Sequence, residues 1–182
     1  MESYRTTLMG MPLDAVLDSD KAVSELARGG VLLSYLNPFA WKVRAQDDDY
    51  PGNLGAMDMV VCDGIGSQRA AKRILGKQLP IVSLDDSGIA PRYLKGFQDR
   101  GSRICLVGGQ EGQLELVSHR LKEKYPGLNL LSSFSGYGSG PDTAREFILE
   151  AQPEVVLAGM GMGKQEAFLV SLRKGGWNET GI

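Results

Sequence analysis

Apolar runs alternate along this chain with segments in which hydrophobic residues recur every three or four positions. The apolar runs are short, nearly continuous and rich in Leu, Val and Ile. Runs of this kind are typical of strands that are buried on both faces of a sheet. Five strands are therefore predicted: Val31–Leu36, Met57–Cys62, Arg103–Val107, Leu128–Phe134 and Val155–Met160.

The segments between these runs favour helices. Leu114, Val117, Leu121 and Tyr125 follow the helical period until Pro126-Gly127 ends it. The other predicted helices are one that Ser19 caps and Gly29-Gly30 stops, Pro38–Asp47, Ser67–Leu75, Ser87–Gln98 and one that starts at Asp142 or Thr143. Strands and helices that alternate in this way predict an α/β fold, in which helices cover both faces of a mainly parallel sheet. Because no repeat, low-complexity tract or linker interrupts the pattern, we expect residues 1–182 to form a single domain.

A glycine-rich loop follows the last predicted strand and leads into a new helical pattern. It reads Gly-Met-Gly-Met-Gly-Lys-Gln-Glu over residues 159–166. Glycines at such a junction let backbone N–H groups approach a ligand, and the N-terminus of a helix favours an anion. A dinucleotide fingerprint needs glycine in place of Lys164, and a Walker A loop needs glycine in place of Ala158 and Ser or Thr in place of Gln165. The sequence therefore predicts a ligand loop of another kind.

Distinctive motifs also follow the other predicted strands. They are Asn37-Pro38, Asp63-Gly64-Ile65-Gly66, Gly108-Gly109 and Gly136-Tyr137-Gly138. Parallel strands have their carboxyl ends at one edge of the sheet, and ligands of open α/β sheets bind in the crevice beyond that edge. We therefore expect these motifs and the glycine-rich loop to line one site.

Asp63 is the best catalytic candidate, because it directly follows an apolar strand. Its carboxylate is expected at the end of that strand in a partly dry cleft, where burial would raise its pKa and suit it to general-base catalysis. Residue type alone favours a structural interpretation instead. In that interpretation Asp63 caps a helix that starts near Ser67, or it shapes the turn before Gly64.

Other groups that could carry chemistry have ordinary structural interpretations. His119 is the only histidine and lies within a predicted helix, which argues against a Ser-His or Cys-His pair. The aspartates at 47–49 either hold a divalent cation or form the hydrated end of a helix, and the second is favoured. Arg69, Lys72 and Arg73 share one helical face, which is either solvated or in contact with the phosphates of a lipid or of a membrane surface.

Two side chains are candidates for reading a nucleobase. Tyr137 stands between two glycines, either as a stacking platform or as a packed turn residue. Gln165 is the sharper candidate, because an amide presents a donor and an acceptor together. Lys164 and Glu166 beside it are otherwise expected to begin a helix.

Composition narrows the class of protein. Hydrophobic residues make up 42% and charged residues 23% of the chain, as in ordinary soluble domains, and the net charge of −2 gives no indication of nucleic-acid binding. Cys62 and Cys105 lie in apolar runs, so we expect buried, reduced thiols in a cytoplasmic protein. No apolar run approaches the roughly 18 residues of a membrane span, and Met1–Thr7 is too polar for a signal peptide.

Seven short motifs stand in a recognisable order along almost the whole chain. They are Leu36-Asn37-Pro38, Cys62-Asp63-Gly64-Ile65-Gly66, Leu106-Val107-Gly108-Gly109, Tyr125-Pro126-Gly127-Leu128, Gly136-Tyr137, Gly159-Met160-Gly161 and Lys164-Gln165-Glu166. Each motif alone is weak, but their order and their positions relative to the predicted strands are specific. Together they resemble the WecG/TagA/CpsF family of bacterial glycosyltransferases.

The resemblance implies a Rossmann-like enzyme of cell-surface polysaccharide or cell-wall polymer biosynthesis. Such enzymes move an N-acetylhexosamine-type or related sugar from a UDP-sugar to a polyprenyl-diphosphate-linked acceptor, with inversion and without a metal or other cofactor. By the resemblance, Asp63 is the general base that takes the proton of the acceptor hydroxyl. The substrate-binding residues implied are Tyr35, Asn37, Gly64, Asp86, Gly108, Gly109, Tyr137, Gly159, Gly161, Lys164, Gln165 and Glu166.

The resemblance also sets expectations about location and partners. The enzyme is expected in the cytoplasm, either free or peripherally at the inner face of the cell membrane. Its partners are expected to be the UDP-sugar donor, the lipid-linked acceptor and, as an open alternative to a monomer, further copies of itself, with no nucleic acid among them.

Three differences from the family pattern keep a second function open. Tyr35 stands where a threonine is frequent, and Ile81 stands where an arginine is common. Family members also continue past the Lys-Gln-Glu motif with a strand, a Gly-Gly-x-Phe-Asp type motif and a basic amphipathic appendage, which we expect this chain to lack. The alternatives are a transferase or its catalytic core, and a nucleotide-sugar-binding protein with little or no transferase activity. The ordered motifs argue against a third, an unrelated Rossmann-like enzyme that acts on a small phosphorylated substrate.

Overall fold

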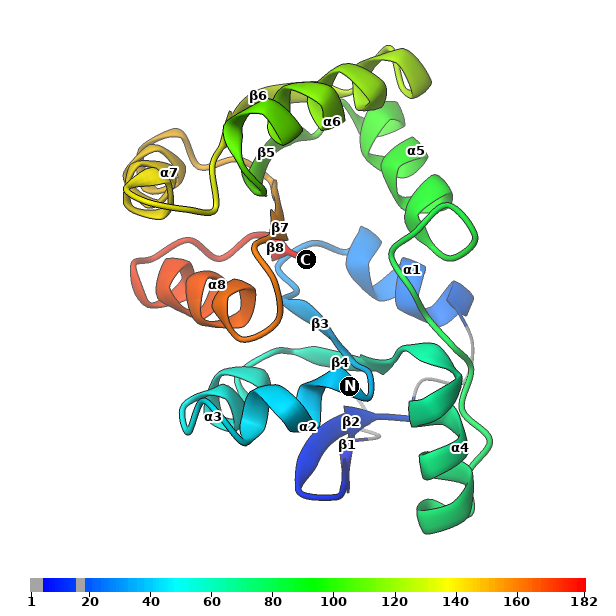
Figure 1. Cartoon of the computed structure of the whole chain (residues 1–182). Coiled ribbons are helices and arrows are strands. Elements are labelled where there is room, and N and C mark those ends of the chain that lie inside the picture. Colours follow the sequence, from blue (N-terminus) through cyan, green and yellow to red (C-terminus); the bar gives the residue numbers. More distant parts are fainter. Residues whose placement is uncertain (1–4, 16–18) are drawn as a thin grey trace.

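Parallel strands form the centre of the computed structural model, which describes residues 5–15 and 19–182 (Figure 1). These strands are β3 (Leu33–Leu36), β4 (Met59–Cys62), β5 (Arg103–Gly108), β6 (Asn129–Phe134), β7 (Val155–Gly159) and β8 (Thr180–Gly181). One sheet has the order β6-β5-β7-β8, and β3 pairs with β4 in a second sheet. A parallel bridge between Leu32 and Gly181 joins the two sheets. Because the pairing is parallel throughout, the carboxyl ends of these strands lie along one edge.

Helices cover both faces of the strands, as predicted. They are α1 (Ser19–Ala27), α2 (Phe39–Arg44), α3 (Tyr50–Gly55), α4 (Gly64–Leu75), α5 (Ala90–Arg100), α6 (Glu111–Lys124), α7 (Gly140–Ala151) and α8 (Lys164–Lys174). Side chains of β5 alternate between two apolar cores: Ile104 packs with residues of α1 and α5, whereas Cys105 and Val107 pack with residues of α7 and α8. The α/β fold with a mainly parallel sheet is therefore confirmed. Within the described part of the chain, none of the helices is long and apolar enough to cross a membrane.

All five predicted strands are present, with bounds that differ by one or two residues. The prediction was wrong about the surroundings of β6, which was expected to be buried on both faces. Residues of β6 alternate between exposed and half-buried, because this strand lies at the edge of the sheet and pairs only with β5. Its apolar residues Leu130, Leu131 and Phe134 nevertheless make the run look like a central strand in the sequence.

Helix starts differ more from the predictions. The helix expected from Ser67 begins at Gly64, so that α4 follows Asp63 directly, and Ser67 is buried inside it. The helix expected from Ser87 begins at Ala90. The single helix expected over Pro38–Asp47 is the shorter α2, and α3 was not predicted at all. Pro51 lies in the first turn of α3, where the missing N–H of proline costs no helical hydrogen bond.

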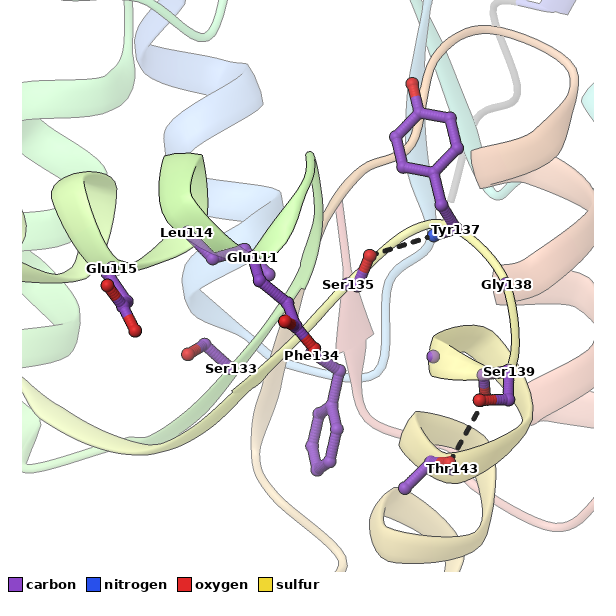
Figure 2. Close-up of a pocket in the computed structure, with 11 residues that line it drawn as sticks. Glu111, Leu114, Glu115, Ser133, Phe134, Ser135, Tyr137, Gly138, Ser139 and Thr143 are labelled. Atoms are coloured by element: carbon purple, nitrogen blue, oxygen red, sulfur yellow. Dashed lines mark hydrogen bonds between the residues drawn. The ribbon is translucent and has the colours of Figure 1, made fainter.

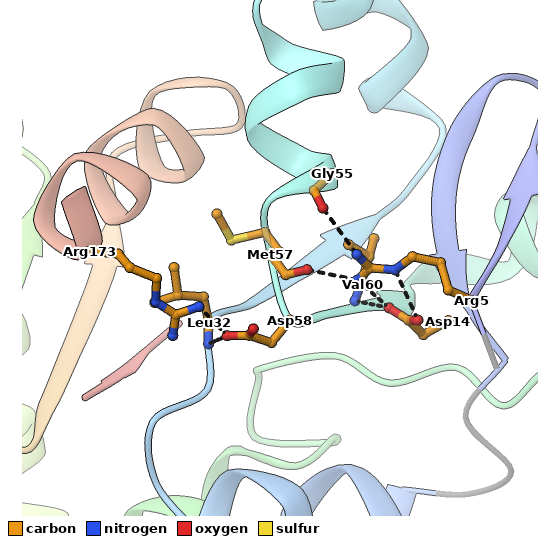
Figure 3. Close-up of polar contacts among 8 residues, drawn as sticks. All are labelled: Arg5, Asp14, Leu32, Gly55, Met57, Asp58, Val60 and Arg173. Atoms are coloured by element: carbon orange, nitrogen blue, oxygen red, sulfur yellow. Dashed lines mark hydrogen bonds and ion pairs between the residues drawn. The ribbon is translucent and has the colours of Figure 1, made fainter. Parts of the chain in front are cut away.

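An antiparallel hairpin at the start of the chain was also not predicted. It consists of β1 (Arg5–Leu8) and β2 (Met11–Asp14). Figure 3 shows how Arg5 donates to the Asp14 carboxyl group and to the carbonyl oxygens of Gly55 and Met57. Oδ2 of Asp14 in turn accepts the N–H of Val60 at 2.7 Å. Polar contacts to β4 thus hold the hairpin in place.

A second set of polar contacts, around Asp58, fastens α8 to the start of β3. Oδ2 of Asp58 accepts the N–H of Leu32 at 2.8 Å and a guanidinium N–H of Arg173 at 2.5 Å (Figure 3). Arg173 also donates to the carbonyl oxygen of Gly30 at 2.9 Å. The last long helix is therefore tied to the strand pair that carries Asp63.

The two cysteines have the predicted environment, since both are free and buried. Burial, with a smaller contribution from Asp63, raises the pKa of Cys62 to about 11. Burial raises the pKa of Cys105 to about 12. Both thiols therefore stay protonated at neutral pH and act as small apolar side chains.

Candidate functional site

Glycines let β5 and β7 approach each other closely at their carboxyl ends. A Cβ atom at Gly108 would lie 2.4 Å from the carbonyl oxygen of Gly159, so no side chain fits there. A Cβ atom at Gly159 or at Gly161 would instead meet no atom within 4 Å. Gly161 also has a φ of +90°, a conformation that residues with side chains rarely adopt. The edge of the sheet therefore presents bare backbone, which we call the glycine floor (Gly108, Gly159 and Gly161).

The loop after β6 packs directly onto this floor. The carbonyl oxygen of Gly109 accepts the N–H of Gly136 at 3.0 Å. Tyr137 follows with half of its surface exposed, and Nζ of Lys164 lies 5.4 Å from the centroid of its ring. This cation–π contact brings the loop after β6 to the first residue of α8. The structure thus places Gly136-Tyr137 and the start of α8 together, as the motif analysis predicted.

Glu166 holds the end of the glycine-rich loop against β3. Its side chain is fully buried; Oε1 accepts the hydroxyl of Ser34 at 2.5 Å, and Oε2 accepts the N–H of Gly163 at 2.6 Å. Nε2 of Gln165 also donates to Oε1 at 3.3 Å. With its oxygens occupied by protein groups, Glu166 supports the loop and orients Gln165. Contact of Glu166 or Gln165 with a substrate stays a prediction.

Asp63 and Asn37 meet at the ends of β3 and β4. The N–H of Asp63 donates to the carbonyl oxygen of Leu36 at 3.0 Å, and Nδ2 of Asn37 lies 3.4 Å from Oδ2 of Asp63. Asp63 is the residue before α4 and is half-buried, but its side chain accepts no capping hydrogen bond from the helix. The carboxyl group is therefore oriented by Asn37 rather than used as a helix cap.

The two motifs that carry these side chains are packed against each other. A Cβ atom at Gly66 would lie 2.6 Å from Cγ of Pro38, so this position must be glycine for the loop after β3 to rest on α4. Gly64, the first residue of α4, has a φ of +77°. The glycines around Asp63 thus serve the close approach of two segments as well as the turn itself.

Two buried tyrosine hydroxyls that interact with each other lack a hydrogen-bond partner. They belong to Tyr35 and Tyr93, and neither has a partner among the described residues. Burial raises the pKa of Tyr35 well above its ordinary value, and the charges of Asp63 and Asp85 raise it further. Burial and then Tyr35 likewise raise the pKa of Tyr93. An unpartnered hydroxyl in the interior costs free energy, so a ligand that accepted a hydrogen bond from Tyr35 would relieve it.

Asp86 has surroundings different from those of the other predicted site residues. Its exposed carboxyl group pairs with Nζ of Lys124 at 2.6 Å. The neighbouring Asp85 is the residue whose charge reaches Tyr35, and hydrogen bonds from Ser87 lower the pKa of Asp85. Binding by Asp86 stays a prediction, and Asp85 is the carboxyl group of this loop whose charge acts on Tyr35.

The aspartates at 47–49 lie near the glycine-rich loop. A Cβ atom at Gly163 would lie 3.4 Å from Oδ2 of Asp47, whose Oδ1 accepts the N–H of Asp49. Among residues 5–15 and 19–182, no group of three or more His, Cys, Asp or Glu side chains is arranged to hold a metal ion. His119 is exposed on α6 beside Glu123, as expected for a solvated helical histidine.

Two hollows lie beside α6, and one of them borders the glycine floor. One, of about 400 Å³, is lined by apolar residues of α6 such as Leu116 and Val117 together with Gly109 and Gly159. The other, of about 520 Å³, is polar and lies between α6, β6 and the start of α7 (Figure 2). Figure 2 shows Glu111, Ser133 and Thr143 around it, whereas the ring of Tyr137 points away. Tyr137 therefore lines the polar hollow at its border, while its ring contacts Lys164.

Comparison with known proteins shows the family of this chain. A model of the "Glycosyl transferase WecG/TagA/CpsF family" matches residues 6–176. The chain belongs to this family. The match includes every loop described above, from Asn37 to Glu166.

Characterised members of the family are distant relatives. The chain is 25% identical to an N-acetylglucosaminyldiphosphoundecaprenol N-acetyl-beta-D-mannosaminyltransferase of Bacillus subtilis, over 79% of this chain and 56% of the relative. It is 20% identical to a UDP-Gal:alpha-D-GlcNAc-diphosphoundecaprenol beta-1,4-galactosyltransferase of Shigella boydii, over 78% of this chain and 59% of the relative. The chain thus spans little more than half the length of these relatives.

Some residues of the site were missed in the sequence. Ser34 lies inside an apolar strand and gave no sign that it would meet Glu166, which is 132 residues away. Asp85 was passed over for Asp86, and Tyr93 was not considered as a site residue within its predicted helix. A Ser within an otherwise apolar strand is the one signal that pointed to a buried polar partner.

Proposed function

We propose that this chain forms the catalytic core of a glycosyltransferase of cell-surface polymer biosynthesis. It would move an N-acetylhexosamine-type or related sugar from a UDP-sugar to a polyprenyl-diphosphate-linked acceptor at the inner face of the membrane. The observation that carries the proposal is the placement of Asp63 and the glycine floor on one edge of the sheet, in a family whose relatives act on undecaprenyl-diphosphate-linked acceptors.

The proposed donor site is the glycine floor and the start of α8. Backbone that is open at Gly159 and Gly161 allows a diphosphate to approach closely, and the N-terminus of the eleven-residue α8 favours its negative charge. Lys164 adds a positive charge at the same point, so that binding of the diphosphate requires no metal ion there. Tyr137 and Gln165 are proposed to bind the uracil ring by stacking and by amide hydrogen bonds.

The proposed chemistry belongs to Asp63. Its carboxylate takes the proton from the acceptor hydroxyl while the hydroxyl oxygen attacks the anomeric carbon. The bond from that carbon to the UDP oxygen breaks, UDP leaves as an anion, and the configuration inverts because attack comes from the opposite face. Asn37 donates to Asp63 and so keeps the carboxylate turned toward the acceptor. No metal or other cofactor takes part in this proposal.

Titration calorimetry with UDP in the presence of a chelator tests the donor site, and product analysis with a UDP-sugar and a lipid-linked acceptor tests transfer. We expect UDP to bind without metal and transfer to be detectable. Failure to bind UDP would contradict the proposal.

A second candidate is a nucleotide-sugar-binding protein without transferase activity. Ile81 favours it, since this exposed apolar side chain stands in the loop where a cation would assist the leaving diphosphate. UDP binding with no transfer to any lipid-linked acceptor would support this candidate over the first.

The buried hydroxyl of Tyr35 gives a prediction that separates binding from stability. Tyr35→Phe removes an unpartnered polar group, so we expect the free energy of unfolding to stay constant or to rise by up to about 1 kcal/mol. If the hydroxyl donates to a substrate, kcat/KM for transfer falls by roughly tenfold, the equivalent of one hydrogen bond. Urea unfolding and steady-state kinetics measure the two effects.

Tyr125→Phe is the matched control for this experiment. Its hydroxyl is also buried and without a partner among the described residues, but it lies before β6, away from the carboxyl edge. We expect no change of kcat/KM in this variant. A kcat/KM of Tyr35→Phe equal to that of wild type would show that the hydroxyl does not contact substrate.

A further inference from the structure

The outer face of α4 has a charge pattern unlike that of the chain as a whole. Although the protein has a net charge of −2, α4 contains three basic residues and no acidic residue. Arg69, Lys72 and Arg73 are all exposed. With Ile65 they are spaced at i, i+4, i+7 and i+8, which places all four on one face of the helix.

These cations have no ion-pair or hydrogen-bond partners in the part of the chain that the structure describes. Among residues 5–15 and 19–182, none of the three makes an ion pair or a side-chain hydrogen bond with another residue. Basic residues of other helices do, as Arg92 with Asp20, Lys95 with Asp99 and Arg173 with Asp58 show. The acidic residues in the loop after α4 are also committed elsewhere, since Asp85 accepts from Ser87 and Asp86 pairs with Lys124.

Two large apolar side chains extend the same surface toward the catalytic candidate. Ile65 is 57% exposed and Phe39 is 52% exposed. They flank the tight contact between Pro38 and Gly66, in the segments that follow Asn37 and Asp63. Lys42 lies over the ring of Phe39, with Nζ 5.4 Å from its centroid. Exposed apolar residues beside unpaired cations are the combination that binds at an anionic lipid interface.

We propose that Phe39, Ile65, Arg69, Lys72 and Arg73, here called the α4 surface, dock the protein on an anionic phospholipid bilayer. The inference rests on the proposed function, because a lipid-linked acceptor presents its reacting hydroxyl close to the membrane. Asp63 immediately precedes α4, so a bilayer that contacts the first turn of this helix lies next to the proposed base. The basic residues bind lipid phosphates, and Phe39 and Ile65 enter the interface.

Cosedimentation with vesicles tests the proposal without any need for catalysis. The chain is mixed with phosphatidylcholine vesicles that contain or lack phosphatidylglycerol, with no UDP and no lipid-linked sugar present. We expect binding to the anionic vesicles, weakening as salt is added, and little binding to the neutral ones. Arg69→Glu/Arg73→Glu should lower the apparent affinity by about twentyfold or more, since each basic residue near an anionic surface contributes roughly fivefold.

Arg120→Glu/Lys122→Glu on α6 is the matched control. It changes the net charge by the same amount at two exposed residues without partners among those described, on a helix at the opposite end of the molecule (Figure 1). We expect its apparent affinity for anionic vesicles to stay within about twofold of wild type. This change is smaller than the roughly fivefold contribution of a single basic residue at the membrane surface. Circular dichroism should show both double variants folded, because all four side chains are exposed.

Three results would overturn the docking inference: no binding of the wild-type chain to anionic vesicles, equal binding to neutral ones, or equal losses in the two double variants. The UDP titration allows the docking inference and the proposed function to be tested separately. A chain that binds UDP and no vesicles overturns docking alone, whereas one that binds anionic vesicles through α4 and no UDP supports docking and contradicts the proposed function.

Discussion

Replacing Asp63 by asparagine is expected to lower kcat for sugar transfer by about 10²–10⁴-fold, the usual contribution of a general base. The amide keeps the size of the side chain and its position at the end of β4, but it cannot take up the acceptor proton. The Kd for UDP should stay within about tenfold of wild type, because the glycine floor and α8 are unchanged. Single-turnover transfer measurements and calorimetry with UDP separate the two quantities.

The fold should tolerate this change. Asp63 makes no capping hydrogen bond to α4, and its contact with Asn37 is long at 3.4 Å, so thermal unfolding should shift little. Asp99→Asn is a suitable control, since it removes an exposed carboxyl group that pairs with Lys95 on the same helix, α5. Turnover of Asp63→Asn equal to wild type would rule Asp63 out as the base. A large loss of UDP affinity would instead make Asp63 a donor-binding residue.

Replacing Glu166 by alanine should lower the free energy of unfolding by about 2–5 kcal/mol. The variant leaves the Ser34 hydroxyl and the Gly163 N–H without an acceptor in a fully buried place, and each unsatisfied group costs about 1–3 kcal/mol. UDP affinity should fall as well, because the same carboxyl group holds the glycine-rich loop and contacts Gln165. Urea unfolding and calorimetry report the two effects.

Glu166→Gln shows how much of the loss of stability comes from the hydrogen bonds of Glu166 and how much from the packing of its side chain. Its amide oxygen can still accept the N–H of Gly163, and its NH2 group can donate to the oxygen of Ser34, whose hydroxyl is free to rotate. We therefore expect less than half of the loss seen with alanine. Equal losses in the two variants would show that the acceptor geometry of Glu166 is not what stabilises the loop.

The sequence predicted the fold class well because the parallel strands β4, β5 and β7 are almost uniformly apolar. For the same reason the sequence predicted that the motifs lie at strand ends, since most of them follow an apolar run whose end is easy to recognise. The hairpin of β1 and β2 was missed because it is held by polar contacts of Arg5 and Asp14 to distant backbone groups. The strand β8 was missed because two residues carry no periodicity, and only pairing on both sides makes them a strand.

The site was predictable as a set of loops but not as a set of contacts. The predicted ends of the strands were enough to place Asn37, Asp63 and the glycine floor on one edge of the sheet, although no distance between them could be predicted. The roles of Glu166 and Gly66 needed the structure, because both depend on segments far away in the chain, Ser34 in one case and Pro38 in the other. The same holds for Tyr35, whose unpartnered hydroxyl is a property of the packed interior.

The position of β8 between β7 and the start of β3 has a consequence for the order in which the protein matures. Gly181 bridges to Leu32, and the carbonyl oxygen of Ile182 accepts the N–H of Ala158, so residues at 180–182 join the strands that carry the glycine floor to those that carry Asp63. These residues leave the ribosome after every other element described here. During synthesis, therefore, the contacts of Glu166 with Ser34 and of Arg173 with Asp58 can form first, and continuous strand pairing across the edge is expected only once β8 has been released.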